Sequence, residues 1–116
     1  MNVGRLRPKA RMRSFLCALR GVGYVLRTQP NAWIMVAAAA CTFAAGLILR
    51  VSRIEWCLLI TAICLVIAAE IFNTALESLT DLVSPEYHPL AGRAKDAAAG
   101  AVLVSAFLAL AIGILV

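Results

Sequence analysis

A narrow stripe of acidic and amide residues interrupts the apolar sequence between residues 69 and 81. The segment reads AEIFNTALESLTD, and these residues lie three, four and four positions apart: Glu70, Asn73, Glu77 and Asp81. At 100° per residue they fall within roughly 80° of arc, so the spacing predicts one polar stripe along a helix. Carboxylates on such a stripe can accept a proton or hold a cation through oxygen. The stripe is therefore the first candidate for a chemical site.

The chain that carries this stripe has the composition of a membrane protein. Of its 116 residues, 63% are hydrophobic, whereas ordinary soluble domains contain roughly 45–50% apolar residues. Residues 31–49 and 97–116 carry no charge, and each run is close to the ~20 residues that a spanning helix needs. A third apolar run covers residues 56–69. We expect one membrane domain over residues 1–116, without a signal peptide, since polar and amphipathic residues precede the first apolar run.

Four helices should position the stripe, which makes the expected fold an all-α membrane protein. An amphipathic helix over about residues 13–29 should lie in the membrane interface, either as a simple anchor or with its basic face holding phosphate. Spanning helices are expected over about residues 31–50, 54–83 and 96–116. The second is longer than a bilayer needs, so it should extend into the cytoplasm. Trp33 and Trp56 should anchor the two interfaces.

The basic residues predict the orientation of the chain. Seven of the eleven precede residue 30. With three spans, the N-terminus and the second connection share a side, which then holds nine basic residues against two on the other. The positive-inside rule places that side, and the N-terminus, in the cytoplasm. Because this topology and contact with anionic lipid account for the net charge of +5, no nucleic-acid binding is expected.

The depth of the stripe in the membrane limits the kinds of reaction that its residues can carry out. Glu70 lies 16 residues after Ile54, or about 24 Å along a helix, within a hydrocarbon core ~30 Å thick. Glu77 lies about 10 Å further towards the cytoplasm. An ionisable residue inside a membrane is costly and is by default a functional hypothesis. The alternative is that the stripe joins helices in an oligomer.

A site at the inner interface suits a reaction between a lipid headgroup and a water-soluble reagent. Glu70 is a candidate general base, and Glu77 could hold a divalent cation through oxygen. Lys95 and the basic face of the first helix, which includes Arg13, could hold phosphate. Base, metal and phosphate contacts are the recurring parts of phosphoryl transfer, so a lipid kinase is expected. The alternatives are a transport or proton-relay subunit that uses Glu70, and a non-catalytic structural membrane protein.

Two segments carry a resemblance to a known family. EIFNTALESLTD and SPEYHPLAGRAKDAAAGAVL, the latter at residues 84–103, resemble the small bacterial integral-membrane diacylglycerol kinases and undecaprenol kinases. The likeness extends from about Ser14 to the C-terminus. It implies ATP-dependent phosphorylation of a lipid alcohol at the bacterial inner membrane, by a homotrimer whose sites are shared between neighbouring chains. Whether the lipid is undecaprenol or diacylglycerol stays open.

The same resemblance implies roles for individual residues. Glu70 corresponds to the catalytic base, and Glu77 to a ligand of Mg²⁺ in the Mg-ATP complex. Further residues on the nucleotide side are implied: Asn73, Glu86, Tyr87, His88, Lys95 and Asp96. Gln29 stands where well-known members carry a second metal-binding glutamate, and its amide oxygen could ligate the metal without adding charge. Asp96 could instead be a helix N-cap.

Overall fold

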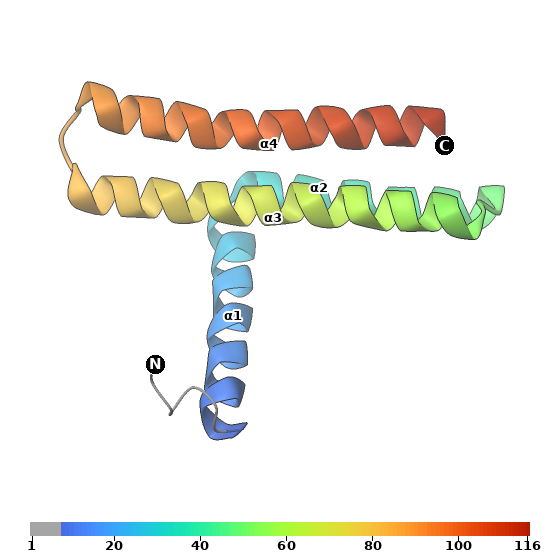
Figure 1. Ribbon diagram of the computed structural model, residues 1–116, viewed down its shortest axis with the longest axis horizontal. Helices are drawn as coiled ribbons and strands as arrows, with labels where there is room; N and C mark the ends of the chain where they lie inside the picture. Colours follow the sequence, from blue (N-terminus) through green and yellow to red (C-terminus); the bar gives the residue numbers. More distant parts are fainter. Residues whose placement is uncertain (1–7) are drawn as a thin grey trace.

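The computed structural model describes residues 8–116, and all the elements in this range are helices. They are α1 (Pro8–Thr28), α2 (Pro30–Leu49), α3 (Arg53–Val83) and α4 (Pro89–Leu115). Helices α2, α3 and α4 run alongside one another, and α1 leaves them at a steep angle (Figure 1). The predicted all-α fold is confirmed for the described residues.

Helix α4 begins before the expected position near residue 96. His88 is its N-cap, with extended backbone angles, and the Nδ1 atom of its side chain accepts a hydrogen bond from the Leu90 N–H at 3.1 Å. Pro89 occupies the first turn, where a missing N–H leaves no hydrogen bond unmade. The alternative that Asp96 is an N-cap is therefore wrong, because Asp96 lies inside α4.

Helix α3 carries the whole stripe without a break. It begins at a capping box, in which the Ser52 hydroxyl accepts from the Glu55 N–H and the Glu55 carboxylate accepts from the Ser52 N–H, both at 3.2 Å. Such a box satisfies two N–H groups that have no partner within the helix. The 31 residues of α3 span about 46 Å, which exceeds the ~30 Å of a hydrocarbon core. The stripe, at residues 70–81, lies in the half of α3 away from this capped end.

Three of the helices, α2, α3 and α4, are long and apolar enough to cross a membrane. Few apolar side chains are buried within the described part of the chain: Val25, Ala32, Leu59, Ala62 and Ala98. Large apolar side chains such as Ile48, Leu82 and Leu115 are instead exposed on the single chain. This pattern is typical of helices that face lipid or other membrane helices, and it marks a membrane protein.

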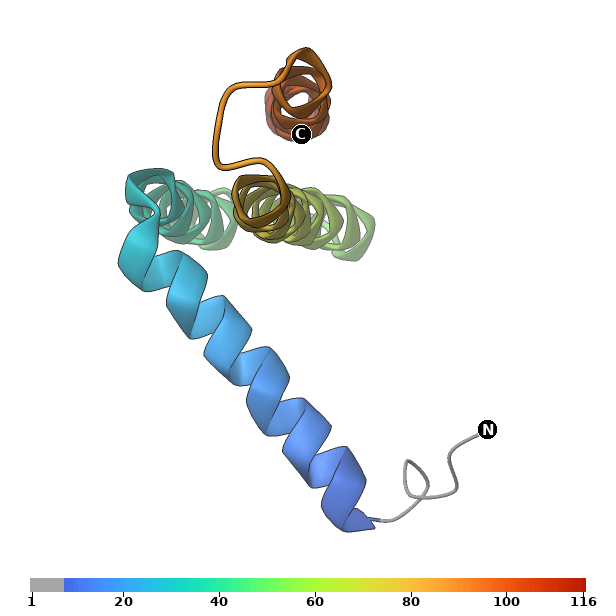
Figure 2. The same ribbon diagram turned by 90° about the vertical axis from the view of Figure 1, so that its left-hand side faces the viewer.

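Helix α3 is the centre of the packing. Viewed end-on, α2 and α4 lie on different sides of α3 (Figure 2), and α4 packs mainly on α3. Close approach of α2 and α3 depends on Gly46, since a Cβ atom there would lie 2.7 Å from the Trp56 ring. The Trp56 ring also stacks at an angle on Phe43, with 5.1 Å between ring centroids. Trp56, expected as an interface anchor, thus also packs α2 against α3.

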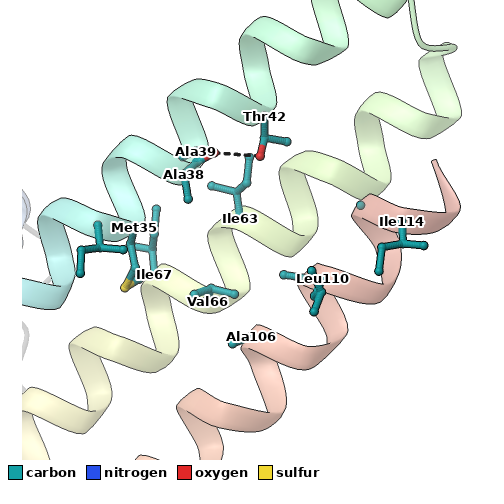
Figure 3. Close-up of a pocket in the computed structure, with 13 residues that line it drawn as sticks. Met35, Ala38, Ala39, Thr42, Ile63, Val66, Ile67, Ala106, Leu110 and Ile114 are labelled. Carbon is teal, nitrogen blue, oxygen red and sulfur yellow. Dashed lines mark hydrogen bonds between the residues drawn. The ribbon is translucent and has the colours of Figure 1, made fainter.

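A hollow of about 430 Å³ opens between α2, α3 and α4 (Figure 3). Its lining includes Met35, Ile63 and Leu110, and its one hydroxyl, from Thr42, donates to the Ala38 carbonyl at 2.8 Å. Its walls are therefore apolar and lack the charged groups that phosphoryl transfer needs. Acidic and amide groups lie instead along the stripe.

Candidate active site

The stripe runs from the interior of the chain to its surface. Glu70 is only 4% exposed, Asn73 and Glu77 are half-buried, and Asp81 is exposed. All four lie on α3, so the order along the helix is also an order of increasing contact with solvent. A group inside the chain and groups at its surface are thus joined on one helix face.

Asn73 and Glu77 form the middle of the stripe. The Asn73 amide donates a hydrogen bond to the Glu77 carboxylate at 3.5 Å. The other polar atom of this amide, Oδ1, is buried and has no hydrogen-bond partner among the described residues. A buried oxygen without a partner costs free energy, so this atom is poised to accept a hydrogen bond or to ligate a cation.

Lys95 connects α4 to the stripe. Its ammonium group donates to the Asp81 carboxylate at 2.5 Å, with side-chain exposures of 41% for Lys95 and 64% for Asp81. Glu77 is the next carboxylate along the stripe, four residues before Asp81 on the same face of α3. The structure therefore brings Lys95 to the exposed end of the stripe, as the predicted phosphate contact requires.

The loop between α3 and α4 lies beside this ion pair. A small hollow of about 140 Å³ is lined by the loop, by neighbouring residues of α4 and by the two charged residues: Asp81, Ser84, Pro85, Glu86, Tyr87, His88, Ala91, Gly92 and Lys95. The loop is held in part by the Ser84 hydroxyl, which donates to the Glu86 carbonyl at 2.8 Å. The predicted nucleotide-side residues Glu86, Tyr87 and His88 are thus gathered next to Lys95.

Three predicted site residues are not joined to this group by a described side-chain contact. Asp96 is exposed on α4, and Gln29 is half-buried at the junction of α1 and α2, where its side chain makes no capping hydrogen bond. Arg13 is exposed on α1, fifteen residues before Thr28, or about 22 Å along the helix. Since α1 points away from the other helices (Figure 1), Arg13 lies far from the stripe of its own chain.

The residues of the stripe fit a magnesium ion in their chemistry. Mg²⁺ prefers oxygen ligands and usually keeps one or two carboxylates together with water and phosphate oxygens. Glu77 supplies a carboxylate, and the buried Asn73 Oδ1 atom is an oxygen without a partner. No group of three or more His, Cys, Asp or Glu side chains that could hold a metal occurs in residues 8–116. A metal there would therefore share its ligands with a bound phosphate.

One contact was not predicted from the sequence, namely the ion pair of Asp81 with Lys95. The residues are 14 positions apart, and neither helical nor strand periodicity links them. The short loop at residues 84–88 could have suggested it, because a short connection makes α3 and α4 antiparallel neighbours.

Comparison with known proteins places the chain in a family. Residues 16–116 match the prokaryotic diacylglycerol kinase family. An undecaprenol kinase of Bacillus subtilis (strain 168) is 40% identical, over 90% of this chain and 85% of the relative. A diacylglycerol kinase of Synechocystis sp. (strain ATCC 27184 / PCC 6803 / Kazusa) is 43% identical, over 86% of this chain and 58% of the relative. A diacylglycerol kinase of Escherichia coli (strain K12) is 36% identical, over 82% of this chain and 84% of the relative.

These relatives are bacterial lipid kinases by name, so the predicted class of enzyme is confirmed. The transport and structural alternatives are set aside. With its three apolar helices, the chain is a bacterial membrane protein and belongs to the prokaryotic diacylglycerol kinase family.

Proposed function

We propose that this protein transfers a phosphoryl group from ATP to the hydroxyl of a membrane lipid alcohol, either undecaprenol or diacylglycerol. The observation that carries the proposal is the graded stripe on α3. It begins with Glu70, a residue that is only 4% exposed, and ends at the exposed ion pair of Asp81 with Lys95. A lipid hydroxyl lies at the membrane interface and ATP lies in water, so their reaction needs a site that reaches both.

Glu70 acts as the general base in this proposal. It accepts the proton of the lipid hydroxyl as the hydroxyl oxygen forms a bond to the γ-phosphorus, and the bond from that phosphorus to ADP breaks. Lys95 donates to the phosphate oxygens and offsets their charge. The nucleotide is held by residues of the loop, of α3 and α4, and of α1: Asn73, Glu86, Tyr87, His88, Asp96 and Arg13.

Glu77 and Gln29 are the proposed protein ligands of Mg²⁺. The half-buried position of Glu77 and its hydrogen bond from Asn73 support this choice, as do the contacts that α1 and α2 each make with α3. Magnesium bound with ATP neutralises charge on the β- and γ-phosphates. Because Gln29 brings no charge, Glu77 supplies most of the negative charge that the protein offers the metal.

We also propose that the whole chain is one lipid-kinase domain that works as a homotrimer in the bacterial inner membrane, with its N-terminus in the cytoplasm. The exposed apolar faces of α2 and α4 support an assembly of several chains. Arg13, far from its own stripe, could serve the site of a neighbour. Helix α1 would lie in the interface with its basic residues towards headgroups. Arg5 and Arg7, which add to the basic N-terminal side, lie outside the described residues.

The lipid substrate is tested by supplying purified protein with labelled ATP, magnesium and a panel of lipid alcohols in micelles. The relatives named undecaprenol kinase and diacylglycerol kinase are 40% and 36% identical to this chain. These similar identities favour neither lipid over the other. We expect labelled lipid phosphate with undecaprenol or diacylglycerol. If folded protein labelled none of the alcohols, the proposal would fail.

A further inference from the structure

We propose that Asp81 is a positioning residue, whose carboxylate holds the Lys95 ammonium group beside the loop that receives the nucleotide. The role rests on the proposed function, in which Lys95 contacts phosphate. Asp81 would touch neither substrate, and it would act only through the lysine. No other step of the reaction is assigned to it.

The geometry of the hairpin explains why these two residues meet. Asp81 lies in the last turn of α3, and Lys95 lies within the second turn of α4. Side chains on an α-helix lean towards its N-terminus. The long Lys95 side chain therefore reaches back towards the loop, where its Nζ atom donates to Asp81 Oδ1.

The charges near Lys95 indicate that its contact with Asp81 does more than join α3 and α4. Asp81 binds Lys95 directly, and Glu77 lies four residues before Asp81, on the same face of α3. Without Asp81, the flexible lysine could turn towards Glu77 and neutralise the proposed metal ligand. With Asp81 in place, the Lys95 charge stays at the exposed end of the stripe, and the charge of Glu77 stays available to the metal.

The ion pair also leaves Lys95 able to bind a phosphate. An ammonium group has three N–H donors, and the described hydrogen bond to Asp81 uses one. The Lys95 side chain is 41% exposed, and both residues line the hollow beside Glu86 and Tyr87. A phosphate group entering that hollow would therefore meet a lysine already held at its edge.

The expected effect is modest and specific to the nucleotide. Exposed ion pairs have small coupling energies, so Asp81→Ala should raise the KM for Mg-ATP by roughly two- to fivefold. The KM for the lipid should not change, because Asp81 lies at the end of the stripe furthest from Glu70. Asp81→Glu keeps the charge and should restore most of the loss.

The test compares the parent protein with Asp81→Ala, Lys95→Ala and the double variant in the labelled-ATP assay. If Asp81 acts through Lys95, the substitution Asp81→Ala should raise the KM for Mg-ATP in the parent protein. The same substitution should have no further effect in the Lys95→Ala background. Glu55→Gln serves as the control, since it also removes one acidic charge but lies at the other end of α3.

The outcomes separate this role from the proposed function. An active parent whose KM for Mg-ATP is unchanged by Asp81→Ala would overturn the positioning role alone. Equal effects of Asp81→Ala with and without Lys95 would also overturn it, because they would show an independent action. A folded parent that phosphorylates no lipid would overturn the proposed function and this role with it.

Discussion

Replacing Glu70 by glutamine separates a catalytic role of this carboxylate from a packing role. Glutamine is nearly isosteric with glutamate, but its amide does not accept a proton at neutral pH. Loss of a general base typically costs 10²–10⁴-fold in rate, or about 3–5 kcal/mol of transition-state stabilisation at ~1.36 kcal/mol per tenfold. We therefore expect kcat to fall by about 10²–10⁴-fold in Glu70→Gln.

The surroundings of Glu70 indicate that the fold should survive this change. The residue is only 4% exposed, and the hydrogen bond from the Thr74 hydroxyl at 3.0 Å is accepted by the backbone carbonyl of Glu70, which the substitution leaves intact. An unpaired carboxylate is costly to bury, and a neutral amide of the same shape avoids most of that cost. The melting temperature of Glu70→Gln should therefore equal or exceed that of the parent.

Activity and thermal unfolding should be measured on the same preparation of Glu70→Gln. Glu55→Gln is the matched control, because it makes the same chemical change on the same helix, and glutamine also suits that position of a capping box. The control should keep the parent's activity. Full activity in folded Glu70→Gln would refute the base assignment, and that result is what a role limited to helix packing predicts.

The remaining predictions concern the metal, the phosphate contact and the packing of α2. Glu77→Gln should raise the magnesium concentration needed for half-maximal activity more than it raises the KM for the lipid, and equal magnesium dependence in variant and parent would refute the ligand assignment. Lys95→Met removes the ammonium group but keeps most of the apolar stem, so the KM for Mg-ATP should rise; an unchanged KM would argue against a phosphate contact. Gly46→Ala would place a Cβ atom 2.7 Å from the Trp56 ring, and overpacking typically costs about 1–3 kcal/mol, so thermal denaturation should show a lower melting temperature. Gly21→Ala, with nothing within 4 Å of the added atom, should not lower the melting temperature, and equal effects of the two substitutions would refute the packing argument.

Much of the fold could be predicted from the sequence because single helices are local structures. The charge-free runs and the spacing of the stripe depend only on residues within one helix, and α2 and α3 begin and end within one residue of the expected bounds. Helix α4 begins at Pro89 rather than near residue 96, because residues before the apolar run also belong to the helix. Its first turns carry Arg93, Lys95 and Asp96, and the cap at His88 depends on a local side-chain hydrogen bond.

Contacts between helices were harder to predict. The ion pair of Asp81 with Lys95 depends on how the loop turns α4 back along α3, and a periodic pattern within one helix does not report that turn. The contact of Gly46 with Trp56 likewise depends on the approach of two helices. The roles of Arg13 and Gln29 were inferred from resemblance and stay predictions, because no described side-chain contact joins either residue to the stripe.

We propose that the stripe on α3 couples ATP cleavage to phosphorylation of a lipid alcohol. The most direct measurement follows ADP and the phosphorylated lipid together, by mass spectrometry, in lipid vesicles that contain the folded protein, magnesium and either undecaprenol or diacylglycerol. We expect one phosphorylated lipid for each ADP formed by the parent, and neither product above background with Glu70→Gln. Release of ADP without phosphorylated lipid, or equal lipid phosphorylation by both proteins, would contradict the claim.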